Sequence, residues 1–169
     1  MKANYRIPFR RRREGKTDYR RRLKLLKSER PRVVVRSSLN NLTVQLIIYD
    51  PKGDQVLASA TSKELTELKW DKPKSNTPCA YLTGLLAGKR AVDKGIKAGV
   101  LDLGLWAPSK GSKVFAAAKG VIDAGVSVPC KKDVIPKKDR IEGMHLTKNT
   151  PELFNEVKKE IEAGKWKKK

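Results

Sequence analysis

Residues 32–60 read RVVVRSSLNNLTVQLIIYDPKGDQVLASA, and this stretch decides the fold. Three segments rich in β-branched and apolar residues, 32–36, 42–48 and 55–60, predict short strands. The connections between them contain Ser, Asn, Asp, Pro and Gly, which favour tight turns. Strands joined by such short connections pair in order, so we expect an antiparallel meander.

Two helices and a fourth strand are predicted after the meander. A helix begins at Thr77-Pro78, with Thr77 as the N-cap, and runs to about Lys94. Residues 100–105 (VLDLGL) show a buried-strand pattern directly after this helix, which favours a crossover into parallel pairing. Residues 113–124 form the second helix, and Gly125 ends it.

The predicted fold class is α/β, a compact sandwich of a mainly antiparallel sheet with helices packed on it. We expect this core domain to span residues 32–130 and to end with a short strand over 126–130. Residues 1–31 are expected to form a basic N-terminal arm with one short helix. Residues 131–169 form a basic C-terminal extension with one helix, which begins at the Thr150-Pro151 capping pair.

Positive charge is concentrated in the arm. The chain has a net charge of +21, and residues 1–32 alone carry 14 Lys and Arg against 3 Asp and Glu. Most of these arginines fall in two clusters, 10–13 and 20–22. Such a density of guanidinium groups repels itself unless many fixed negative charges lie opposite, and a nucleic-acid backbone is the commonest such surface. Arg also suits forked hydrogen bonding to phosphate.

The second cluster is expected to lie on a helix over residues 18–28 with Thr17 as its N-cap. Tyr19, Leu23 and Leu26 would form one apolar stripe that leans on the core, while the cations face outward. The aromatic residues Tyr5 and Phe9 further upstream have two interpretations. They stack on RNA bases, or they dock on the protein's own body.

Several function classes find no support in the sequence. Cys79 and Cys130 stand alone, without a CxxC motif, and His145 is the only histidine, so no metal site and no catalytic group of residues is expected. No cofactor or small-molecule substrate is expected, and no enzyme activity. No apolar run approaches the roughly 20 residues of a membrane span, and the simplest setting is a reducing cytoplasm. The alternatives left open are a basic RNA-binding or RNA-processing protein that works on its own and, with less support, a protein of anionic membrane surfaces.

A set of collinear motifs resembles the universal large-subunit ribosomal protein family L eighteen, in its archaeal and eukaryotic branch. The motifs are RRREGKTDYRRRL at 11–23, RPRVVVR at 30–36, YDPKGD at 49–54, NTP at 76–78 with YLTGLLAG at 81–88, and VLDLGL at 100–105. The resemblance covers roughly residues 5–130, and it implies the same α/β fold that the strand and helix patterns predict.

The resemblance also implies a role. Members of this family are structural constituents of the large ribosomal subunit that bind 5S rRNA and help to attach it to the large-subunit rRNA at the central protuberance, beside neighbouring ribosomal proteins. It carries no catalytic residues. Together with the charge pattern, it predicts RNA contacts in the arm, at the first hairpin tip and at the start of the second core helix. The predicted RNA-binding residues are Arg10, Arg11, Arg12, Arg13, Lys16, Tyr19, Arg20, Arg21, Arg22, Lys24, Lys27, Arg32, Arg36, Ser38, Asn40, Asn41, Lys110 and Lys113.

Overall fold

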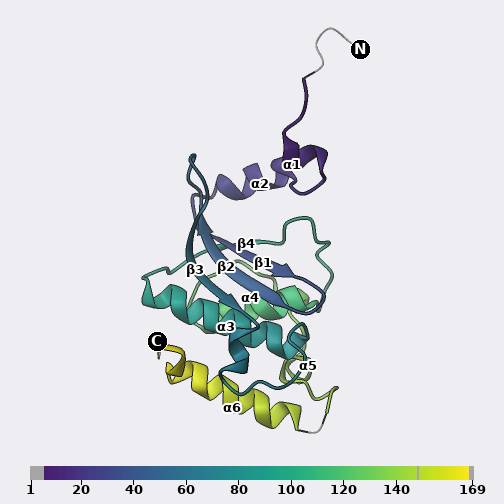
Figure 1. The fold of residues 1–169 in the computed structure, drawn as a ribbon, viewed down its shortest axis with the longest axis vertical. Helices are drawn as coiled ribbons and strands as arrows, with labels where there is room; N and C mark the ends of the chain where they lie inside the picture. Colours follow the sequence, from purple (N-terminus) through teal and green to yellow (C-terminus); the bar gives the residue numbers. More distant parts are fainter. Residues whose placement is uncertain (1–5, 148, 168–169) are drawn as a thin grey trace.

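A four-stranded sheet lies at the centre of the computed structural model, which describes residues 6–147 and 149–167 (Figure 1). The strands are β1 (Arg32–Ser37), β2 (Leu42–Ile48), β3 (Gln55–Thr61) and β4 (Val100–Asp102), in the order β3-β2-β1-β4. The first three strands pair antiparallel, and β4 pairs parallel to β1. The predicted meander and the predicted crossover are both confirmed, and so is the α/β fold class.

Alternation along the strands separates two faces of the sheet. The inner face carries apolar side chains with almost no exposure, such as Val33 and Val35 of β1 and Val44 of β2. The β4 strand is shorter than the predicted segment 100–105 because the chain turns after Asp102. Gly104 adopts a left-handed φ of 58°, and its amide donates to the Asp102 carboxylate at 2.9 Å.

Two long helices, α3 (Thr77–Asp93) and α4 (Lys113–Asp123), cover the inner face of the sheet (Figure 1). They approach closely because Gly84 and Gly120 lie at their contact, where any Cβ would overlap the facing backbone. The N-cap of α3 is Asn76 rather than Thr77, as its side chain accepts from the Cys79 amide at 2.9 Å. Asn and Thr are both common N-cap residues, and here the Asn76 side chain is the one that reaches a free amide of the first helical turn.

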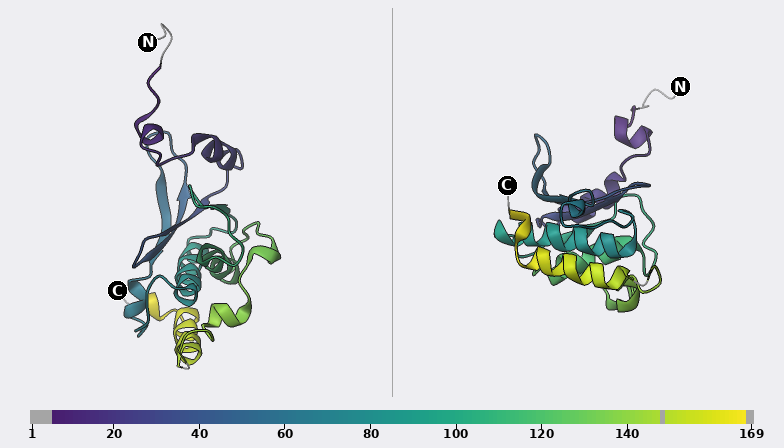
Figure 2. Two further views of the ribbon diagram at one scale, coloured as in Figure 1. Left: turned by 90° about the vertical axis from the view of Figure 1, so that its right-hand side faces the viewer. Right: turned by 60° about the horizontal axis from the view of Figure 1, so that its bottom comes forward.

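The C-terminal segment adds a further layer. The helix α6 (Thr150–Glu162) packs on α3, so that α3 and α4 lie between the sheet and α6 (Figure 2). The helix begins at Thr150, as predicted, but its N-cap residue is Asn149 rather than Thr150. The segment also contains elements that the sequence pattern did not predict: α5 (Lys138–Glu142) and the 3₁₀ turns η2 (Lys132–Val134) and η3 (Lys165–Lys167).

Two other predictions for the core are corrected. Residues 126–130 do not form a strand; they make a single bridge, between Ala98 and Ser127. The connection 61–76, which reads as polar, holds the 3₁₀ turn η1 (Glu64–Thr66) and completely buries Trp70. Leu65 and Leu68 of the same segment are buried with it, so three apolar side chains tie this connection to the core.

The arm, as described from residue 6 to residue 31, lies beyond the other face of the sheet, at the opposite end of the molecule from α6 (Figure 1). It contains α1 (Arg10–Arg13) and α2 (Tyr19–Leu26), and neither helix has a buried residue. The N-cap of α2 is Asp18 and not the expected Thr17, because the Asp18 carboxylate accepts from the amides of Arg20 and Arg21. The α1 turn was not predicted. Residues 32–130 are called the body below.

Candidate RNA interface

Side-chain contacts attach the arm to the body. Arg22 of α2 donates to both carboxylate oxygens of Asp54, at 2.8 and 3.0 Å, and its guanidinium lies 5.9 Å from the centre of the Tyr49 ring. Arg21 donates to the Gly104 carbonyl at 2.8 Å. Asp54 belongs to the turn between β2 and β3, and Gly104 follows β4. The two arginines therefore tie α2 to two separate parts of the body.

Arg32 extends this attachment into the sheet. Arg32 is only 4% exposed. Its guanidinium pairs with Asp54 at 2.5 Å and with Asp102 at 2.7 Å. Arg22, Asp54, Arg32 and Asp102 thus form one continuous chain of alternating charge. Arg32 was predicted to contact RNA, but in the structure it is a buried structural cation. Its partner Asp102 is an internal acceptor, as expected of a lone aspartate on a strand.

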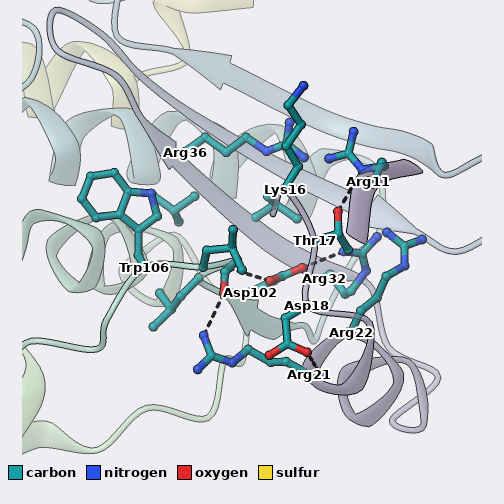
Figure 3. Close-up of a pocket in the computed structure, with 15 residues that line it drawn as sticks. Arg11, Lys16, Thr17, Asp18, Arg21, Arg22, Arg32, Arg36, Asp102 and Trp106 are labelled. Carbon is teal, nitrogen blue, oxygen red and sulfur yellow. Dashed lines mark hydrogen bonds and ion pairs between the residues drawn. The ribbon is translucent and has the colours of Figure 1, made fainter. Parts of the chain in front are cut away.

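A groove of about 330 Å³ lies between the arm, the outer side of β1 and the loop after β4 (Figure 3). Six Lys or Arg side chains line it: Arg11, Lys16, Arg21, Arg22, Arg32 and Arg36. Among the described residues, two carboxylates line the groove. Asp18 already caps α2, and Asp102 already pairs with Arg32. The groove is therefore electropositive, with a partly apolar wall that includes Trp106.

Most of the arm cations in the predicted set are exposed. The exposed members of the predicted set in the arm are Arg10, Arg11, Arg12, Arg13, Lys16, Arg20, Arg21, Lys24 and Lys27, while Tyr19 and Arg22 are half-buried. Glu14 lies among them; hydrogen bonds from Lys16 and Arg10 are the main reason that its pKa is below the ordinary value. The three carboxylates of the arm, Glu14, Asp18 and Glu29, do not balance this surface, so the arm offers a dense, accessible array of cations.

The first hairpin tip forms a second cluster with the start of α4. Lys113 donates to the Ser75 hydroxyl at 2.9 Å, and that hydroxyl donates to the Ser38 carbonyl at 3.1 Å. The structure thus brings Lys113 to the hairpin, although the two are far apart in sequence. Ser38 and Asn40 are exposed, as are Arg36 and Lys110, and Asn41 is half-buried. Lys110 stays in the exposed loop before α4.

Comparison with known proteins shows the family of the chain. Residues 3–99, more than half of the chain, match the family described as "Ribosomal large subunit proteins 60S L5, and 50S L18". The chain belongs to this family of large-subunit ribosomal proteins. It is also 51% identical over 156 residues to the protein named large ribosomal subunit protein uL18 from Methanococcus maripaludis, an alignment that covers 92% of this chain and 80% of that protein. The family resemblance expected from the sequence motifs is confirmed.

Some surface residues of this ribosomal protein were missed by sequence reasoning. Lys63, Lys72 and Lys74 border the same shallow depression as the hairpin tip. They are spread through the connection after β3, so no charge cluster marks them in the sequence. Trp106 lines the basic groove and is 52% exposed. The signal that could have found it is a tryptophan within a Gly- and Pro-containing loop, directly after a buried strand.

Residues 6–147 and 149–167 offer little to support other kinds of site. No group of three or more His, Cys, Asp and Glu side chains there is placed to hold a metal ion. None of the helices in this part of the chain combines the length and apolarity needed to cross a membrane. Burial raises the pKa of Cys79 to about 12 and also raises that of Cys130, so both thiols are protonated near neutral pH. Tyr5 and the tail residues Lys168 and Lys169 lie outside the described residues.

Proposed function

We propose that this protein is a structural, non-catalytic constituent of the large ribosomal subunit, and that it binds 5S rRNA and helps to attach it to the large-subunit rRNA. The observation that carries the proposal is the exposed arginine array of the arm, fixed on the body by Arg21 and Arg22. Membership in a family of large-subunit ribosomal proteins supports the ribosomal part of the proposal.

The mechanism follows from the charge distribution. Cations of α1 and α2 neutralise RNA phosphates and release counterions, which supplies most of the affinity. Selectivity for 5S rRNA comes from RNA shape, because side chains do not enter the deep major groove of A-form RNA. The hairpin tip, with Lys113 and the neighbouring lysines, offers a second contact region on the same rigid body. Two regions at a fixed separation can recognise a fold where a single polycation cannot.

The test is binding to purified 5S rRNA and to an unrelated structured RNA of equal length, over a salt series. We expect tighter binding to 5S rRNA, and a preference that persists at high salt. A variant with Arg11, Arg12, Arg20 and Arg21 all changed to Ala should lose most of the affinity. Its plot of log affinity against log salt should be shallower by roughly 3, since each lost phosphate contact removes about 0.7 to 0.9.

A matched control removes four exposed lysines from the C-terminal segment. These are Lys131, Lys137, Lys138 and Lys159. Both variants lose the same charge, so only a specific arm interface separates them. Equal effects of the two variants, or equal affinity of the wild type for both RNAs, would show a generic polycation and overturn the assignment to 5S rRNA.

A further inference from the structure

The loop after β4 holds a tryptophan at the edge of the basic groove. The loop is fixed on both sides: the Gly104 amide donates to Asp102, and the Gly104 carbonyl accepts from Arg21 of the arm. The Trp106 amide donates to the Leu103 carbonyl at 3.1 Å, which closes the turn. The backbone at Trp106 is therefore held by both the arm and the body.

Trp106 differs from the other two tryptophans. Trp70 is completely buried in the core, and Trp166 is half-buried, donates to the Ile161 carbonyl and lies under the Arg90 guanidinium. Within residues 6–147 and 149–167, the indole of Trp106 makes no hydrogen bond and no ring contact, and half of it is exposed. An exposed aromatic side chain on an ordered loop gains little from the fold itself, and such residues are enriched where proteins bind partners.

The surroundings of Trp106 select the chemistry of the partner. Figure 3 shows Trp106 at one end of the groove and the arginines of the arm at the other. Arg36 and Lys16 also line the groove, and neither groove carboxylate is unpaired. A cationic or purely apolar segment would not complement these charges. A nucleotide does, since it has a phosphate for the cations and a flat base for the indole.

We propose that Trp106 is a stacking platform for one unpaired base of the bound RNA, with Arg36 and Lys16 contacting the adjoining phosphates. The neighbouring Leu105, also exposed and part of the groove wall, extends the apolar surface beside the indole. This inference rests on the proposed function, because it assigns a role within RNA binding. It adds recognition of a splayed-out base to the recognition of phosphates, so the groove distinguishes an RNA loop from a continuous duplex.

The experiment compares Trp106→Ala and Trp106→Phe in the full chain. The probes are 5S rRNA and a fully paired RNA duplex of similar length. We expect Trp106→Ala to weaken binding of 5S rRNA about 10-fold, within the range seen for single stacked bases. The slope against salt should not change, because no phosphate contact is lost. Trp106→Phe should restore most of the affinity, and binding to the duplex should be the same for all three proteins.

A control variant and a direct readout complete the design. Met144→Ala removes an exposed apolar side chain from the C-terminal segment and should leave RNA binding unchanged. Bound 5S rRNA should protect wild-type tryptophan fluorescence from quenching by acrylamide, and Trp106→Phe should remove most of that protection.

The inference is wrong if Trp106→Ala binds 5S rRNA like the wild type, or if it weakens binding of the duplex RNA equally. It is equally wrong if Trp106→Ala binds 5S rRNA normally but fails to enter large subunits, which would indicate a protein partner. The proposed function fails separately, if the wild type shows no preference for 5S rRNA.

Discussion

The body and the arm use opposite means to hold their helices. In the body, α3 buries 13 of its 17 residues between the sheet, α4 and α6, whereas α1 and α2 of the arm bury none. Burial of apolar side chains stabilises a helix within the folded protein, without the binding of another molecule. The arm depends instead on a few polar contacts, and its remaining cations repel one another until an anion arrives. A binding surface of this kind keeps its charges accessible because it contributes little to the core.

The largest expected difference comes from the same substitution made in the two regions. Leu85 of α3 is 1% exposed, and Leu23 of α2 is 58% exposed. Leu85→Ala should lower the free energy of unfolding by about 3 kcal/mol, through lost burial and a cavity. Leu23→Ala should change it by less than about 0.5 kcal/mol. Urea denaturation of both variants measures the contrast, and similar values for the two would mean that the arm is part of the core.

A second substitution tests the close contact of α3 with α4. A Cβ on Gly120 would overlap the Tyr81 carbonyl and the Leu85 amide, so Gly120→Ala must push the helices apart. We expect a loss of about 2 kcal/mol in unfolding free energy, despite the better helix propensity of alanine. Lys24→Ala, at an exposed position of α2, is the control and should be nearly neutral. A stabilised Gly120→Ala variant would show that the helices can separate freely.

The junction between the two regions should respond to a smaller change. Asp54→Asn removes the carboxylate that Arg22 and Arg32 share, while Arg32 keeps its pair with Asp102. The expected loss in global stability is about 1 kcal/mol. The larger consequence is local: the amides of α2 should exchange with deuterium faster, while those of α3 keep their protection. Asp71→Asn at an exposed site is the control. Unchanged exchange in α2 would place the anchor of the arm elsewhere.

The smallest effect concerns the cap of α2 and depends on pH. The Arg21 amide, with help from that of Arg20, holds the pKa of Asp18 below its ordinary value of 3.8. A lowered pKa means that the ionised cap stabilises α2 fully above the ordinary value and is lost as pH falls through the folded value. On acidification, α2 amides should therefore lose protection before α3 amides do. Asp18→Asn keeps a capping side chain that does not titrate, so it should remove this step. A step that persists in Asp18→Asn would assign it to another group.

Most of the fold could be predicted because it depends on local patterns. The alternation in residues 42–48 and the capping pair at 77–78 each predict an element, and β2 and α3 form there. The alternation fails only at the end of β2, where a register shift buries Ile47 and exposes Ile48. The errors lie where local signals compete. Asp18 and Thr17 are both good caps, and so are Asn76 and Thr77; the structure uses the residue whose side chain reaches the free amides of the first turn. Short elements such as α5 lack enough periodicity to be recognised.

Only part of the candidate site could be predicted from the sequence. The clustered charge identified the arm, because arginines at adjacent positions in the chain give a high density of positive charge in any conformation. The same reasoning could not show that Arg32 is buried and paired with Asp54 and Asp102, because these contacts join residues up to 70 positions apart. It also missed Trp106, which shares a groove with Lys16 and Arg36 only because the loop after β4 meets the arm.

By itself, the sequence determined the α/β class, the order of β1 to β4 and of the helices α2, α3, α4 and α6, the basic arm and the ribosomal family, because each is carried by residues that are neighbours in the chain. Only the tertiary structure decided which cations are exposed and which are used inside the fold, how Lys113 joins the hairpin tip, and which groove an exposed indole shares with the arginines. The physical reason is that charge pairing and burial depend on distance in space, and a close approach between distant residues exists only after the sheet and its helices have packed.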